Sequence, residues 1–271
     1  MVILVFILGL GCGSFVNMLV FRTAIRYGLT PGGILNRVQD DKVSFCDYCG
    51  KQLSWYENIP VFSWVVQRGK SRCCGCPLPR EYPIVELTTG LLFLLNYNFS
   101  FDYSGLHFVS QFPIFQTILG FVVVTMLVFA AVFDIKYMIL PDFSTGILIV
   151  IAVVRIMLGG HTGPPVQYLL AAGGGAVFLL VLYWLTKGKG MGMGDVKLAV
   201  FMGLWLGWPK IVVAFYVAFV TGAVVGGGLM LVKKLKRKSI IAFGPFLILG
   251  ILVAWWWGDW IIFNSKSLIF K

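Results

Sequence analysis

Two aspartates stand at the ends of apolar runs, where an ionisable side chain is costly and usually functional. Asp134 ends the run 114–133, and Asp195 follows the glycine-rich turn 189–194 and opens another hydrophobic stretch. Two carboxylates that approach each other can hydrolyse a peptide bond: one activates water while its protonated partner polarises the carbonyl. Both could instead be helix-end acids, one of them at a favourable helix N-terminus. The residue types alone leave both roles open.

A Cys-x-x-Cys pair occurs twice, as Cys46 with Cys49 and as Cys73 with Cys76. The pairs are separated by 23 residues, which suits a tetrahedral zinc site with four thiolate ligands. Two disulfides are the competing interpretation, which a reducing cytoplasm disfavours. Cys74 adjoins the second pair and could replace a neighbour as ligand. We therefore predict a structural zinc ion bound by Cys46, Cys49, Cys73 and Cys76.

Two further acids lie near predicted helix starts. Asp142 follows Leu140-Pro141 and is expected to act as the N-cap of the next helix. Glu86 lies early in the second apolar run. An acid there complements the helix dipole, and its closeness to the membrane also makes it a functional candidate.

The composition is that of a membrane protein. Of 271 residues, 59% are hydrophobic and 12% are charged, whereas a soluble domain is about half apolar and about a quarter charged. A span takes about 20 residues. We predict an all-α polytopic membrane protein with about eight transmembrane helices, at residues 1–21, 83–97, 114–133, 143–158, 166–186, 196–208, 211–232 and 240–258.

Basic residues predict the orientation of these spans. With eight spans, 18 of the 22 Lys and Arg fall on one side, which the positive-inside rule makes the cytoplasmic side. The opposite loops, 98–113 and 159–165, contain none. Topology therefore accounts for the net charge of +11 without a nucleic-acid partner.

The chain is expected to have three parts. Residues 1–22 form a first transmembrane helix, and residues 83–271 form a transmembrane helical core that carries both aspartates. Between them lies a cytoplasmic cysteine-rich insert, residues 23–82. The insert is too small for a large core of its own, so a bound metal would stabilise it.

Several motifs together resemble the type IV prepilin peptidase family. The segment Gly192-Met193-Gly194-Asp195 resembles the Gly-x-Gly-Asp signature of that family. Asp134 with the downstream Leu140-Pro141-Asp142 resembles its first aspartate segment. The other matching segments are Gly13-Ser14-Phe15-Val16-Asn17 with Arg22, the two cysteine pairs, Asn58-Ile59-Pro60, Tyr82-Pro83-Ile84-Val85-Glu86 and Phe243-Gly244-Pro245-Phe246. The resemblance runs from about residue 9 to about residue 250.

The resemblance implies an aspartic endopeptidase of the bacterial inner membrane. Members of the family cleave the short basic leader of type IV prepilins and pseudopilins on the cytoplasmic side, after a glycine and before a residue that is often phenylalanine. By position, Asp134 and Asp195 would be the catalytic pair, and the four paired cysteines would bind the metal.

The resemblance also implies a second activity. Members with the cysteine-rich insert typically methylate the new N-terminal amine with S-adenosylmethionine. Glu86 and Gly90 fall in the segment that resembles the one linked to methyl transfer. The expected partners are a prepilin or pseudopilin and membrane lipid, with no nucleic acid. Local acids are expected to help receive the basic leader; they are Asp40, Asp41, Asp47 and Glu57.

Two alternatives remain. A protease that has lost methyl transfer would share every motif. A polytopic transporter with a zinc-bound loop would also place acids at membrane depth, but it would use Asp134 and Asp195 without peptide cleavage.

Overall fold

The computed structural model describes residues 1–29, 45–46, 48–100, 113–160, 163–188, 191–232 and 242–269. Its described residues form helices joined by turns, with isolated β-bridges and no strand among them. This confirms the predicted all-α class. The chain divides into two compact units, Met1–Asn98 and Phe99–Lys271. This boundary falls in the last turn of the second long helix, Glu81–Ser100.

The first unit contains α1 (Val2–Arg26), the short helices η1 (Trp55–Asn58) and α2 (Phe62–Val66), and α3 (Glu81–Ser100). Glycines let α1 and α3 approach closely. A Cβ atom added at Gly9 would lie 2.7 Å from the Cα of Gly90, and one added at Gly13 would lie 2.6 Å from the Cα of Glu86. Small residues serve this purpose in membrane helices, because they let backbones pack against each other.

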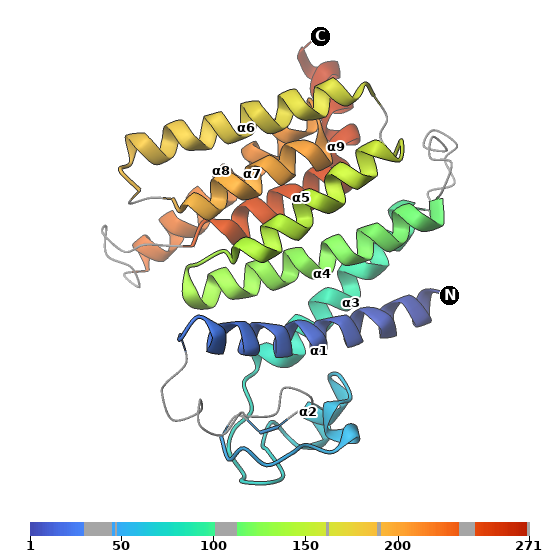
Figure 1. Ribbon diagram of the computed structural model, residues 1–271, viewed down its shortest axis with the longest axis vertical. Helices are drawn as coiled ribbons and strands as arrows, with labels where there is room; N and C mark the ends of the chain where they lie inside the picture. The colour runs from blue at the N-terminus through green and yellow to red at the C-terminus, as the bar shows by residue number, and fades with distance from the viewer. Residues whose placement is uncertain are drawn as a thin grey trace. The chain divides into compact units, whose positions relative to one another are not determined.

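The second unit is a bundle of six helices in its described part: α4 (Pro113–Tyr137), α5 (Asp142–Met157), α6 (Pro165–Leu185), α7 (Met193–Leu206), α8 (Lys210–Leu231) and α9 (Gly244–Ile269). α7 is the inner helix, with neighbours α5, α6, α8 and α9 (Figure 1). Its residues from Leu204 to Leu206 are all buried, as is most of the rest. A helix that is apolar all round belongs in such a core.

The far end of α7 is fixed by a cation. Arg155 of α5 donates a hydrogen bond from Nη1 to the backbone carbonyl of Trp205 at 2.7 Å. Its guanidinium also lies 4.4 Å from the centre of the Trp205 ring. A cation there satisfies a terminal carbonyl and complements the negative end of the helix dipole. This contact ties α5 to α7.

Each of the eight predicted spans coincides with one long helix. Five of these helices are long and apolar enough to cross a membrane by length and composition: Val2–Arg26, Ile114–Tyr137, Pro165–Leu185, Lys210–Leu231 and Gly244–Ser265. Of the others, α5 and α7 have only 16 and 14 residues, and α3 is more polar, with Glu86 and Asn96 in its buried face. A multi-pass chain is therefore supported, while the count of eight stays a prediction.

Gly203 offers a test of the helix packing. A Cβ atom added at Gly203 of α7 would collide with the backbone of Ala171 and Ala172 of α6. We expect Gly203→Ala to destabilise the bundle by about 1–3 kcal/mol, because the helices must move apart. For a chain of this size this lowers Tm by roughly 2–4 °C per kcal/mol. Circular dichroism during heating in detergent measures the change.

The matched control is Gly174→Ala in α6. No described atom lies within 4 Å of a Cβ added there, and alanine favours a helix over glycine by about 1 kcal/mol. We expect an unchanged or raised Tm. Equal Tm values for both variants and the wild-type protein would contradict the tight α6–α7 contact.

Candidate active site and metal centre

Asp134 lies in the last turn of α4 with 5% of its surface exposed. Its Oδ2 accepts a hydrogen bond from the backbone N–H of Gly244, the first residue of α9, at 3.1 Å. A Cβ atom added at Gly244 would lie 2.5 Å from this same oxygen. The carboxylate therefore requires glycine at this position, and it lies at the positive end of the α9 dipole.

Asp195 lies in the first turn of α7 and is also 5% exposed. Its Oδ2 accepts a hydrogen bond from the backbone N–H of Gly192 at 3.0 Å. Gly192 is the N-cap of the helix, so the glycine-rich turn itself orients the carboxylate. The next glycine, Gly194, has a packing role, because a Cβ atom added there would lie 2.8 Å from the Cβ of Leu140.

Leu140 connects the surroundings of the two acids. It is buried, and its side chain lies against Gly194 beside Asp195. Its Cδ1 is also 3.4 Å from the position of a Cβ at Gly244, beside Asp134. The second unit thus contains two buried acids, each of which accepts a hydrogen bond from one backbone N–H group. Leu140 packs against both Gly194 and Gly244.

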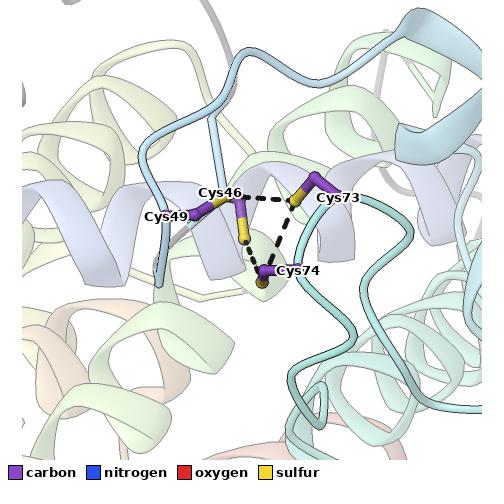
Figure 2. Close-up of side chains that lie close together, drawn as sticks. All are labelled: Cys46, Cys49, Cys73 and Cys74. Carbon is purple, nitrogen blue, oxygen red and sulfur yellow. Dashed lines mark hydrogen bonds between the residues drawn. The ribbon is translucent and has the colours of Figure 1, made fainter.

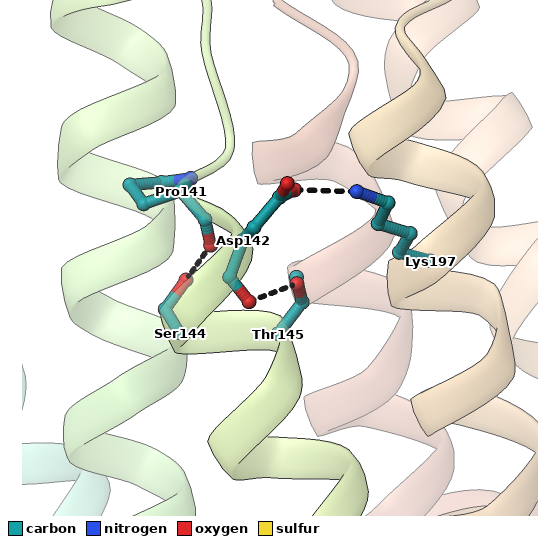
Figure 3. A network of polar contacts seen from close by, with 5 residues as sticks. All are labelled: Pro141, Asp142, Ser144, Thr145 and Lys197. Atoms are coloured by element: carbon teal, nitrogen blue, oxygen red, sulfur yellow. Dashed lines mark hydrogen bonds and ion pairs between the residues drawn. The ribbon is translucent and has the colours of Figure 1, made fainter.

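Asp142 does not act as an N-cap. The N-cap of α5 is Pro141, and Asp142 is the first residue of the helix. Its Oδ1 pairs with Nζ of Lys197 in α7 at 2.6 Å, as Figure 3 shows. The carboxylate of Asp142 is therefore engaged by a residue of another helix. Both side chains are exposed, at 72% and 45%, so the pair adds little stability.

Four cysteines of the first unit converge, as Figure 2 shows. Their sulfur atoms all lie within 4.8 Å of one another, and the set is Cys46, Cys49, Cys73 and Cys74. Neighbouring sulfurs are 3.2 Å (Cys49 and Cys73), 3.8 Å (Cys46 and Cys74) and 4.0 Å (Cys73 and Cys74) apart. A tetrahedral zinc with Zn–S bonds of about 2.3 Å requires sulfurs roughly 3.8 Å apart. The donor set therefore fits zinc, and the cysteines are free thiols with no disulfide among them.

Two short turns of the same design carry these cysteines. In the first turn, the N–H of Gly50 bonds to the carbonyl of Cys46 at 2.9 Å, and Gly50 has φ of 71°. In the second turn, the N–H of Gly75 bonds to the carbonyl of Ser71 at 2.8 Å, and Gly75 has φ of 70°. Only glycine adopts this conformation without strain. Ser71 therefore occupies, in the second turn, the place of Cys46 in the first.

This equivalence explains why Cys74 belongs to the cluster. Cys49 and Cys74 each stand directly before the turn glycine. Cys73 adds the fourth sulfur, while Cys76 corresponds in the second turn to Lys51 in the first. Spacing alone selected Cys76 as the fourth ligand. The structure instead gathers Cys74 with the other three, and Cys76 is not one of the four.

Hydrogen bonds within the cysteine cluster shift the pKa values of its thiols. The pKa of the Cys74 thiol is lowered to about 6, because the backbone and the side chain of Cys76 hydrogen bond to it. The lowered pKa favours the thiolate of Cys74, the form that binds metal. Against the hydrogen bond from Ser71, the neighbouring Cys49 thiol raises the pKa of Cys73 to about 11. The hydroxyl of Ser71 lies 2.9 Å from the sulfur of Cys73 and 3.5 Å from that of Cys46, so it helps to orient both.

Glu86 and Gly90 have different surroundings. Glu86 is 6% exposed, and its Oε2 accepts the N–H of Val61 at 2.7 Å. The hydroxyl of Ser14 also hydrogen bonds to this carboxylate. Gly90 lies in the contact between helices, because a Cβ atom added there would be 2.8 Å from the ring of Phe6. Glu86 is therefore a candidate site residue, whereas Gly90 acts by packing.

Two family models match the chain. The bacterial peptidase A24 N-terminal domain matches residues 7–99, and the type IV leader peptidase family matches residues 121–227. A prepilin leader peptidase/N-methyltransferase of Xanthomonas campestris pv. campestris is 33% identical over 93% of this chain and 90% of its own. The chain belongs to the prepilin leader peptidase/N-methyltransferase family.

Other family members agree over nearly the whole length. The protein of the same name from Aeromonas hydrophila is 32% identical, covering 94% of this chain and 90% of its own. The one from Bacillus subtilis is 30% identical, covering 97% and 96%. No solved structure matches the chain. The first family match, residues 7–99, nearly coincides with the first compact unit.

Four acids are expected to receive the leader peptide, and the structure describes one of them, Glu57. Asp40, Asp41 and Asp47 lie outside the described residues. Glu57 has a local partner, since its Oε2 accepts the N–H of Ser54 at 2.8 Å. The sequence motifs also gave no role to Leu140, although its side chain packs beside both aspartates. Leu140 belongs to the Leu-Pro-Asp segment, but its contact with both glycine positions exists only in the folded chain.

Proposed function

We propose that this protein cleaves the leader of type IV prepilins or pseudopilins with Asp134 and Asp195, and then methylates the new N-terminus. The observation that carries the proposal is the pair of buried carboxylates, each oriented by a backbone N–H at a helix end. Membership of a family whose relatives are named prepilin leader peptidase/N-methyltransferase supports the substrate.

The chemistry of cleavage needs the two carboxylates in different protonation states. One takes a proton from water, which attacks the scissile carbonyl, while the protonated carboxyl donates its proton to the carbonyl oxygen. When the tetrahedral intermediate collapses, the C–N bond breaks, the leaving amine takes the proton that the first carboxylate accepted from water, and the second carboxylate takes back a proton from the hydroxyl group of the intermediate. The N–H groups of Gly244 and Gly192 hold one oxygen of each carboxylate, which leaves the other oxygen for water or substrate.

We place both activities on the cytoplasmic side of the bacterial inner membrane. The support is the distribution of Lys and Arg along the sequence, which favours a cytoplasmic location for the insert and for the loops beside both aspartates. A prepilin has a hydrophobic helix behind a basic leader. Its helix could lie among the spans while its leader stays in water.

Methyl transfer is assigned to the first unit. When bound, S-adenosylmethionine supplies an electrophilic methyl group carried on sulfur. The residues of this unit would have to hold the deprotonated N-terminal amine of the pilin beside that methyl group. Glu86 places a buried carboxyl group in this unit, which would pair with a cation when ionised. Zinc bound by the cysteine cluster would hold the insert in shape, because metal binding supplies folding energy to a small segment.

Substrate cleavage gives the direct test. The purified protein is incubated in detergent with a prepilin whose leader ends in glycine, and with the same prepilin carrying valine at that position. We expect the first to lose its leader and the second to stay intact, as analysed by N-terminal sequencing. A wild-type protein that cuts neither substrate would contradict the proposal.

Glu86 should separate the two activities. We expect Glu86→Ala to reduce methylation by at least about tenfold more than cleavage, since the Asp134–Asp195 pair lies in the other unit. Mass spectrometry of the processed pilin measures both the missing leader and the added methyl group. Gly90→Leu should act in the same direction through the contact with Phe6.

Glu81→Gln is the matched control, because Glu81 is an exposed acid on the same helix. It should leave both activities close to those of the wild-type protein. Parallel loss of cleavage and methylation in Glu86→Ala would instead indicate a shared site or general misfolding.

A further inference from the structure

The first unit contains a cavity of about 450 Å³. Residues of α1, of the insert and of the start of α3 line it, among them Ser14, Asn17, Trp64, Tyr82 and Glu86. All lie within the one compact unit. The volume falls in the usual range of small-molecule sites, about 300–1,000 Å³. Nothing in the sequence pattern predicted this cavity, because its walls come from segments far apart in the chain.

The residues that line the cavity are complementary to a ligand that is zwitterionic and carries an aromatic ring. Two acids, Glu57 and Glu86, and one cation, Arg22, line the cavity. Five aromatic residues also line it: Phe15, Phe21, Phe45, Trp64 and Tyr82. Carboxylates and ring faces attract a cationic group such as a sulfonium, a guanidinium binds a carboxylate, and aromatic rings stack on a flat base.

The wall beside Glu86 is built with strain. Val61 has φ of 59° and ψ of −50°, a conformation that is unfavourable for a β-branched residue. The N–H of Phe62 bonds back to the carbonyl of Pro60 at 2.5 Å across this tight turn. The turn directs the N–H of Val61 to Glu86. Strained backbone is typical of ligand sites, where surrounding contacts hold it in place.

Two further features belong to this wall. The indole Nε1 of Trp64 is buried and has no acceptor within the described part of the chain, and such donors are normally paired. Cys46 and Ser71 both line the cavity. Cys46 belongs to the cysteine cluster, and Ser71 contacts its sulfur atom. The metal would therefore hold one side of the cavity in shape.

We propose that this cavity binds S-adenosylmethionine. Glu57 and Glu86 would attract its cationic groups, Arg22 would bind its carboxylate, and an aromatic residue of the lining would stack on its adenine. The inference rests on the proposed methyl transfer and assigns the donor site for it. It also gives the cysteine-rich insert a direct part in donor binding.

A cavity-filling variant tests the site. Ser63 of α2 lines the cavity, so the ring of Ser63→Phe occupies ligand space. Titration calorimetry of the full-length, zinc-containing protein with S-adenosylhomocysteine should show Kd raised by at least about tenfold. Val65→Phe is the matched control, because Val65 lies on the same short helix, is 59% exposed and is not a lining residue. Its Kd should match that of the wild-type protein.

The outcome does not depend on the folding of a variant. Radiolabelled S-adenosylmethionine, cross-linked to the wild-type protein by ultraviolet light, should label peptides within residues 11–22 or 45–86. Label confined to residues 113–269, or an unchanged Kd in Ser63→Phe with its zinc retained, would overturn the assignment. If the wild-type protein still methylates pilin in that case, the proposed function stands and only the donor site is wrong. A wild-type protein that binds no donor and adds no methyl group refutes both.

Discussion

Asp134→Asn and Asp195→Asn are each expected to lower the rate of prepilin cleavage by at least about 100-fold, the usual range for loss of a general acid or base. An asparagine keeps the shape and accepts the same backbone hydrogen bond at its oxygen, so the fold and the α4–α9 contact should persist. It cannot exchange the proton that hydrolysis requires. Initial rates with a purified prepilin, measured for each variant in detergent, give the result.

Asp142→Asn is the matched control for this prediction. Asp142 lies close in sequence to Asp134, but its side chain is exposed and pairs with Lys197. Its substitution should change the cleavage rate by no more than a few-fold. Wild-type rates in Asp134→Asn or Asp195→Asn would show that the buried acids are structural, which is the interpretation of helix-end acids that the sequence left open.

The second large effect concerns the metal. We expect Cys74→Ser to reduce bound zinc from about one ion per chain to a small fraction of that, because it removes one of four thiolates. Cys76→Ser should retain the ion. The two cysteines are two residues apart, so the comparison separates the observed cluster from the ligand set that spacing selects. Elemental analysis of the purified proteins measures the zinc content.

Proteolysis adds a structural readout to this comparison. Loss of the metal should expose the insert to cleavage by trypsin, since the small segment depends on metal for stability. The insert of Cys76→Ser should resist as well as that of the wild-type protein. Loss of zinc in Cys76→Ser with full retention in Cys74→Ser would return the fourth ligand to the position predicted from sequence.

Hydrophobic patterning was enough to place the long helices. Apolar segments long enough, or nearly long enough, to span a membrane can be identified directly in the sequence. Each predicted segment coincides with one helix. Helix ends were less accurate. α4 continues past Asp134 to Tyr137, so the acid lies inside the last turn, and α9 begins at Gly244 instead of residue 240. Apolar residues indicate which segment lies in the membrane. They do not indicate where its helix begins or ends, because helix ends depend on local hydrogen bonds.

Contacts between distant segments could not be predicted in this way. The hydrogen bond from Gly244 to Asp134 joins residues 110 positions apart, and no periodicity encodes it. The packing of Leu140 against both Gly194 and Gly244 is likewise not encoded in any periodicity. The exchange of Cys76 for Cys74 has a different cause. The Cys-x-x-Cys spacing selects Cys76 as the fourth ligand. The sequence nevertheless contains a pattern that indicates Cys74, because Gly75 follows Cys74 as Gly50 follows Cys49.

One measurement tests the central claim most directly. A prepilin is incubated with the wild-type protein and excess S-adenosylmethionine, and the intact product is weighed by mass spectrometry. We predict a product that has lost its leader after the glycine and has gained the mass of one methyl group. A product that lacks the leader but carries no methyl group would make this chain a protease only. An uncut prepilin, or a cut at another position, would contradict the assignment of this protein as a prepilin leader peptidase.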